Sequence, residues 1–191
     1  SFLNKRIYTS NRNLKNEINT SIEALTKSTL ISVNDLETRI TNEKTDLLEM
    51  QKDINKQLKT IKDTYDELNK KDTVTADEIK KINDKLTTEL KTVEDNMKEL
   101  NKKFINIEEI QSEITKLKNS ILSSMTNKDA SEAAVVKTDI TNIKSSNEEM
   151  QKLINHINKK VVDLQAKAKE LTDKGDRTTA LETRINTINT Q

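Results

Sequence analysis

Residues 79–125 read IKKINDKLTTELKTVEDNMKELNKKFINIEEIQSEITKLKNSILSSM, and their apolar residues recur at alternating spacings of three and four. The apolar positions of this stretch are Ile79, Ile82, Leu86, Leu90, Val93, Met97, Leu100, Phe104, Ile107, Ile114, Leu117, Ile121 and Met125. A spacing of about 3.5 residues is the period of left-handed supercoiled helix packing. The stretch therefore predicts a long helix that buries one apolar seam against other helices.

The rest of the chain repeats this pattern and contains almost nothing that would interrupt it. Three further seams are Leu3, Ile7, Leu14, Ile18, Ile22 and Leu25; Leu36, Ile40, Leu47, Met50, Ile54, Ile61, Tyr65 and Leu68; and Val136, Ile140, Ile143, Met150, Ile154, Ile157, Val161, Leu164, Ala168 and Leu171. The 191 residues include no proline and only one glycine. We expect an all-α, elongated, antiparallel up-and-down bundle of four helices. The alternative is three long helices in a spectrin-like arrangement, which would leave about twenty residues of the first helix without partners.

Four breaks in the seam set the expected helix boundaries. Residues 69–74 interrupt the rhythm before Thr75, a cap residue with Glu78 three positions later. Residues 126–128 interrupt the rhythm before Asp129, a cap residue with Glu132 three positions later. Gly175 can end a helix. Residues 26–33 are rich in Ser, Thr and β-branched residues, and a cap at Asn34 follows them. The prediction is a single domain, 1–191, with helices at about 1–31, 34–70, 76–126, 130–174 and 177–190.

Composition argues against several classes of function. The 33 basic and 32 acidic side chains are mixed along the chain, which disfavours nucleic acid as a partner. No apolar run approaches the roughly 20 residues of a membrane span. Without cysteine, with His156 as the only histidine and with one glycine, the chain offers no thiolate site, paired histidine ligands or phosphate-binding loop. We therefore expect no enzymatic activity, no cofactor and no metal.

Five polar residues fall at seam positions, and they are candidates for a conformational switch. They are Glu43, Gln57, Glu89, Gln111 and Asn147. A polar side chain in a core costs about 1–3 kcal/mol unless it finds a hydrogen-bond partner. One interpretation is that these residues fix the register of the helices or lie where a helix side is exposed. The other is a metastable bundle that is poised to open.

The N-terminal segment is basic. Residues 1–16 contain four cations and no acid, together with two of the four aromatic residues of the chain. The candidates for contact with an anionic membrane surface are Phe2, Lys5, Arg6, Arg12 and Lys15. The alternative is that this segment is the solvated start of a helix.

About a third of the residues are Lys, Asn or Ile, which adenine- and thymine-rich codons encode. In this bias, its lack of cysteine, its size and its polar seam positions, the chain resembles the Plasmodium sporozoite microneme proteins essential for cell traversal, in their four-helix-bundle form. The resemblance covers the whole chain and implies secretion from micronemes and a role in breaching host cells during malaria infection. It carries over no catalytic residue. The chain begins at Ser1 without Met, which we interpret as a mature or trimmed fragment.

Under this interpretation, the expected partner is a host membrane surface or another parasite protein, and the expected state is a monomer. Two other classes of function remain open. A receptor-binding adhesin domain would present a specific exposed patch. A structural coiled coil of a phage or bacterial surface would assemble into a parallel oligomer.

Overall fold

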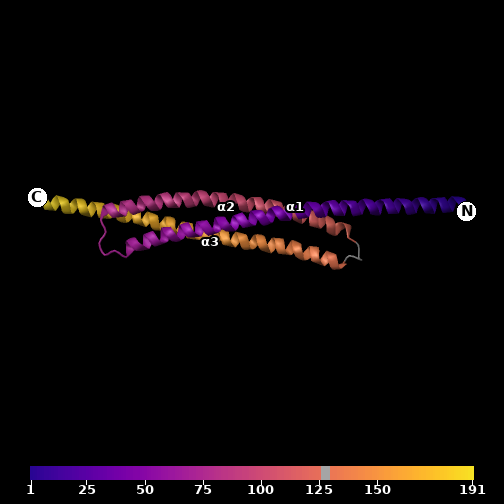
Figure 1. Ribbon diagram of the computed structural model, residues 1–191. Coiled ribbons are helices and arrows are strands. Elements are labelled where there is room, and N and C mark those ends of the chain that lie inside the picture. The colour runs from indigo at the N-terminus through magenta and orange to yellow at the C-terminus, as the bar shows by residue number, and fades with distance from the viewer. Residues whose placement is uncertain (126–129) are drawn as a thin grey trace. The chain divides into compact units, whose positions relative to one another are not determined.

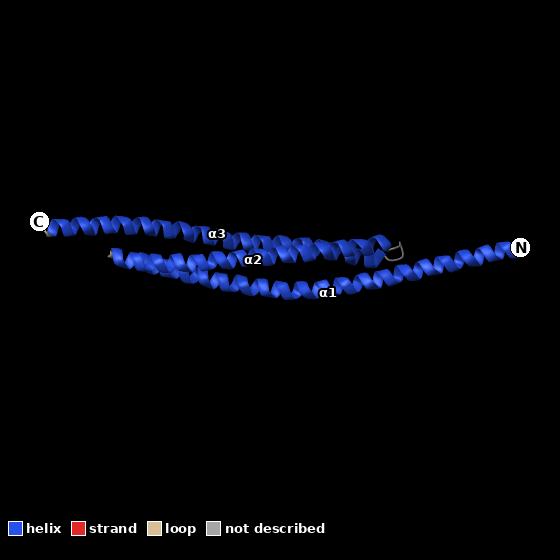
Figure 2. Ribbon diagram, turned by 90° about the horizontal axis from the view of Figure 1, so that it is seen from above, coloured by secondary structure: helices blue, strands red, loops and turns tan. Residues whose placement is uncertain are grey.

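The computed structural model describes residues 1–125 and 130–191, and it contains three helices (Figure 1). These are α1, Phe2–Asn69; α2, Ala76–Ser124; and α3, Ala130–Asn189. No strand is present in the described part of the chain, as the colouring by secondary structure shows (Figure 2). The all-α prediction is confirmed. The expected count of four helices is wrong, and the three-helix alternative fits.

The predicted break between residues 31 and 34 is absent, because α1 continues through it. The hydroxyl groups that were expected to compete with helix formation are accommodated within the helix. Thr26 Oγ1 donates to the carbonyl of Ile22 at 3.0 Å, and Thr29 Oγ1 donates to that of Leu25 at 2.8 Å. The low helix propensity of such residues costs less than about 0.7 kcal/mol each, which neighbouring turns offset by cooperativity.

The predicted break at Gly175 is also absent. Helix α3 continues through this residue to Asn189, and no glycine of the described chain has a positive φ. The glycine instead allows α3 to approach α2 closely at this position. A Cβ atom built on Gly175 would lie 3.0 Å from Cγ2 of Ile79, a buried residue of α2. The hydrogen atom of glycine therefore fits where a larger side chain would displace Ile79.

The turn between α1 and α2 lies where the seam is interrupted in sequence. Helix α2 begins at Ala76, and Thr75 Oγ1 accepts a hydrogen bond from the backbone N–H of Glu78 at 3.2 Å. The N–H of Ala76 donates to Glu182 Oε1 at 3.0 Å. Two otherwise unpaired N–H groups of the first turn are thus satisfied. The predicted break at residues 126–128, with its cap at Asp129, lies outside the described residues.

The chain divides into two compact units, and each helix contributes a segment to both. Unit 1 comprises Ser1–Lys44 and Asn106–Glu148. Its buried apolar cluster consists of Val33, Ile40, Ile110, Ile114 and Ile121, and Leu36, Leu117, Met125 and Ile143 pack against it. All three helices supply side chains to this core.

Unit 2 comprises Thr45–Ile105 and Glu149–Gln191. Its core includes Leu47, Ile54, Ile61, Leu86, Leu100, Ile154 and Leu171, each at most 2% exposed. Contacts between helices define their directions within this unit. Asp46 pairs with Lys103 and Gln57 with Asn96, so residue numbers rise along α1 as they fall along α2. Helices α2 and α3 also run in opposite directions, because Gln165 donates a hydrogen bond to Glu94 and Asn83 donates one to Thr172. Consecutive helices of unit 2 are therefore antiparallel.

Candidate functional site

The N-terminal segment of α1 exposes its apolar residues. Every residue from 1 to 25 is exposed, within unit 1. Six apolar residues of this segment fall within an arc of about 100° on a helix with 3.6 residues per turn. We call them the N-terminal stripe: Leu3, Ile7, Leu14, Ile18, Ile22 and Leu25, which are 42–68% exposed. The three-helix arrangement thus leaves much of this segment exposed, as expected for that alternative, although Ile22 and Leu25 line a shallow pocket together with Ser120 and Ile121 of α2.

The residues proposed for membrane contact do not share the face of the N-terminal stripe. At about 100° of rotation per residue, Phe2, Lys5 and Arg12 fall on the side of the helix opposite to the stripe. Arg6 and Lys15 fall at its flanks. All five side chains are exposed, and Phe2 is exposed by 78%. The apolar stripe and half of the positive charge of this segment therefore lie on opposite surfaces of the helix.

An eleven-residue repeat, which a 3.5-residue spacing does not reveal, connects the N-terminal stripe with the buried core. Leucine recurs at every eleventh position from residue 3 to residue 58: Leu3, Leu14, Leu25, Leu36, Leu47 and Leu58. Eleven residues are close to three helical turns, so these leucines lie along one face. Within unit 2, Leu47 and Leu58 are 1% and 3% exposed, whereas Leu3 and Leu14 of unit 1 are 66% and 56% exposed. One sequence pattern is covered by helices in one part of α1 and uncovered in another.

The polar seam residues differ in how well their hydrogen-bonding groups are satisfied. Gln111 is 1% exposed, and its Oε1 atom has no hydrogen-bond partner. Glu89 and Asn147 are half-buried, and each has one buried oxygen without a partner. Gln57 is satisfied, since its Oε1 accepts from Asn96 Nδ2 at 3.1 Å. Glu43 is half-buried and has an interaction partner. Unsatisfied buried oxygens of this kind each cost about 1–3 kcal/mol.

Two lysines of unit 1 lie near Gln111 and were not identified from the sequence. Lys118 of α2 is buried, and its Nζ atom pairs with Glu37 of α1 at 3.1 Å and with Asp139 of α3 at 3.4 Å. Lys44 Nζ donates to Ser146 Oγ at 3.0 Å, and desolvation by burial lowers the pKa of this lysine below its ordinary value of 10.5. A cavity of about 440 Å³ is lined by both lysines and Gln111. Lysine at a seam position is hard to recognise because its aliphatic part packs like an apolar residue.

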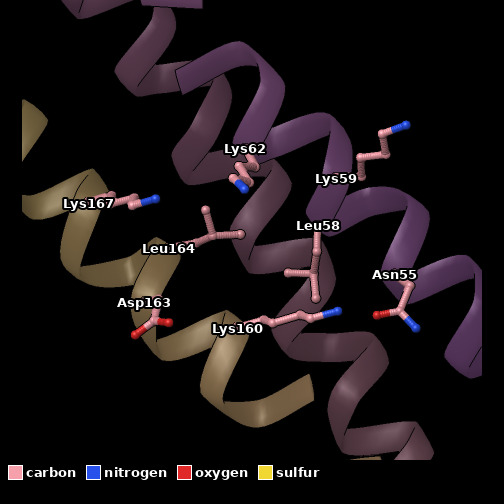
Figure 3. Close-up of a pocket in the computed structure, with 8 residues that line it drawn as sticks. All are labelled: Asn55, Leu58, Lys59, Lys62, Lys160, Asp163, Leu164 and Lys167. Carbon is pink, nitrogen blue, oxygen red and sulfur yellow. The ribbon is translucent and has the colours of Figure 1, made fainter. Parts of the chain in front are cut away.

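Unit 2 contains a groove between α1 and α3 that is rich in lysine, and we call it the lysine groove (Figure 3). Its volume is about 470 Å³, and the buried side chains of Leu58 and Leu164 lie within it. In Figure 3, Lys62 of α1 and Lys167 of α3 point toward each other, and Lys160 extends from α3 toward α1.

The remaining charged residues of the lysine groove point away from its centre. Figure 3 shows Lys59 and Asp163 directed outward, on different helices. Asp163 is the one carboxylate among the groove's lining residues. The Nζ atom of Lys167 also lies 5.5 Å from the centroid of the Tyr65 ring, a cation–π contact. The centre of the groove thus presents three ammonium groups around an apolar floor.

Two features of the described residues bear on metal ions and membranes. Within residues 1–125 and 130–191, no group of three or more His, Cys, Asp or Glu side chains is placed to hold a metal ion. None of the helices, over the residues that the structure describes, has a segment both long and apolar enough to cross a membrane. In comparisons with known proteins, no family model, no curated protein and no solved structure matches the chain.

Proposed function

We propose that this protein is a non-enzymatic docking protein that uses the N-terminal stripe of α1 to bind a second helical chain, in the first instance another copy of itself. The observation that carries the proposal is the eleven-residue leucine repeat. Leu47 and Leu58 of this repeat are covered by helices, whereas Leu3, Leu14 and Leu25 are exposed. Because the exposed leucines follow the same eleven-residue spacing as the leucines that other helices cover, the exposed surface is suited to bind a helix as well.

The width of the N-terminal stripe also favours a helical partner. Between its apolar residues, Ser10 and Ser21 occupy the same face, so only about two residues per two turns are apolar. A stripe this narrow is typical of a coiled-coil seam. Docking through it requires no opening of the core, because the stripe is already exposed.

A peripheral contact with an anionic membrane is the second candidate. The observation that favours it is the cluster of four cations with no acid in residues 1–16. Basic amphipathic helices bind anionic lipid by combining apolar burial with electrostatic attraction. This candidate is weaker because Lys5 and Arg12 fall opposite to the stripe, so an inserted stripe would direct them away from the headgroups.

The biological setting that we propose follows the resemblance to the Plasmodium traversal proteins. In that setting the protein is secreted from micronemes and its docking assists passage through host cells. The unsatisfied groups of Glu89, Gln111 and Asn147 support the related proposal that the core can open. The receptor-binding and coiled-coil classes are alternatives, and self-association belongs to the latter.

Sedimentation equilibrium of the full chain tests the docking proposal. We expect association that increases with concentration and is lost in the double variant Leu14→Ser, Ile18→Ser. The matched control is Phe2→Ser, Tyr8→Ser, which removes two exposed aromatic side chains outside the stripe. All four residues are exposed, so neither variant should unfold the protein.

Flotation with vesicles of anionic lipid tests the second candidate in the same variants. A chain that stays monomeric at every concentration, and floats with vesicles unless Lys5 and Arg12 are changed to Gln, would refute helix docking in favour of membrane contact. The sequence-based expectation of a monomer differs from our proposal, and sedimentation decides between the two.

A further inference from the structure

The lysine groove of unit 2 concentrates positive charge that its own carboxylates do not neutralise. In the described part of the chain, no ion pair includes Lys62, Lys160 or Lys167. This contrasts with unit 1, where the buried Lys118 has two carboxylate partners within 3.4 Å. Since the chain as a whole has a formal net charge of only +1, three converging ammonium groups are a local exception.

Holding three such groups over one groove is unfavourable without a counter-ion. Like charges that are held close together repel each other, and near a protein surface an effective dielectric constant of about 20 weakens this repulsion only in part. Lys62 and Lys160 are exposed and can reduce this repulsion by moving apart, whereas Lys167 is half-buried and lies 5.5 Å from the centroid of the Tyr65 ring. An anion between the helices would convert the repulsion into attraction.

The shape of the groove suits a ligand of moderate size. A volume of about 470 Å³ lies within the range of roughly 300–1,000 Å³ that is usual for small-molecule sites. Lysine binds phosphate and sulfate as a point charge with three rotatable donors, so it tolerates different orientations of a tetrahedral oxyanion. Leu58 and Leu164 would contact the carbon skeleton between the anionic groups.

We propose that the lysine groove binds a soluble small molecule that carries two or more phosphate or sulfate groups. Lys62 and Lys167 bind one oxyanion from opposite helices, and Lys160 binds a second. This site is separate from the N-terminal stripe and does not depend on the docking proposal. Because the ligand bridges α1 and α3, its binding also stabilises unit 2.

Isothermal titration calorimetry of the full chain at low salt tests this proposal. The probes are sodium tripolyphosphate for the phosphate source and sucrose octasulfate for the sulfate source. We expect at least one probe to bind with a Kd that rises tenfold or more in the triple variant Lys62→Gln, Lys160→Gln, Lys167→Gln. The tighter probe identifies the source of the oxyanion.

The matched control changes three exposed lysines of α1 and α3 that do not line the groove: Lys52→Gln, Lys152→Gln and Lys169→Gln. It removes the same total charge, so an effect of net charge alone would weaken binding equally in both variants and would overturn the proposal. Absence of binding by both probes would also overturn it. Circular dichroism of each variant establishes that the helices are intact.

Discussion

Replacing Gln111 by leucine should stabilise the protein. The side chain is 1% exposed, and its Oε1 atom has no hydrogen-bond partner, so folding removes an amide oxygen from water without compensation. This loss costs about 1–3 kcal/mol, and leucine at the same place also adds apolar contact with Ile114 and its neighbours. We expect Gln111→Leu to increase the free energy of unfolding by about 2 kcal/mol.

Thermal unfolding followed by circular dichroism measures this effect. For a protein of this size each kcal/mol shifts Tm by about 2–4 °C, so we expect a rise of about 4–8 °C. The matched control is Gln57→Leu, which leaves Asn96 without the acceptor it has at 3.1 Å and should not raise Tm. A lower Tm for Gln111→Leu, or an equal rise in both variants, would show that the unsatisfied oxygen does not weaken the core.

Two further predictions concern Gly175 and Lys44. Gly175→Leu should lower the free energy of unfolding in urea by about 1–2 kcal/mol, because its Cβ would lie 3.0 Å from Ile79 Cγ2 and this crowding outweighs the roughly 1 kcal/mol that leucine gains over glycine within a helix. Leucine at the exposed Lys169 should change it by less than about 0.5 kcal/mol. Equal stability of the two variants would contradict the close approach. For Lys44, burial lowers the folded pKa below 10.5, so the cost of its charge is fully present below the folded pKa and disappears as pH rises toward 10.5. Lys44→Met should therefore be most favourable relative to the wild type near pH 7, and a stability difference that does not shrink by about pH 10.5 would refute this reasoning.

The helical class could be predicted from the sequence because the apolar spacing is continuous, but the number of helices could not. The residues that suggested breaks, Thr26, Thr29 and Gly175, all lie inside helices. Local propensity at each is worth less than about 1 kcal/mol, and the packing and cooperativity of a long helix outweigh it. The break before Thr75 combines lost seam positions with a cap residue, and there the structure has a turn.

The candidate sites were less accessible to sequence analysis. Gln111 could be placed at a seam position by counting, but whether its oxygen finds a partner depends on a neighbouring helix. The lysine groove could not be foreseen, because Lys62 and Lys160 become neighbours only through the register between α1 and α3. The eleven-residue leucine repeat was visible in the sequence, and a search at longer periods would have found the stripe from Leu3 to Leu25.

The exposed N-terminal segment of α1 also determines the order in which contacts with a partner can form. Every residue from 1 to 25 is exposed, and helical order with little tertiary packing is marginal. Amide hydrogens of Leu3 and Leu14 should therefore exchange faster than those of the buried Leu47 and Leu58. A partner would engage the repeats one after another, starting beside the bundle, and each repeat would complete three more turns of helix. The binding free energy would then increase in increments, one for each eleven-residue repeat that engages the partner.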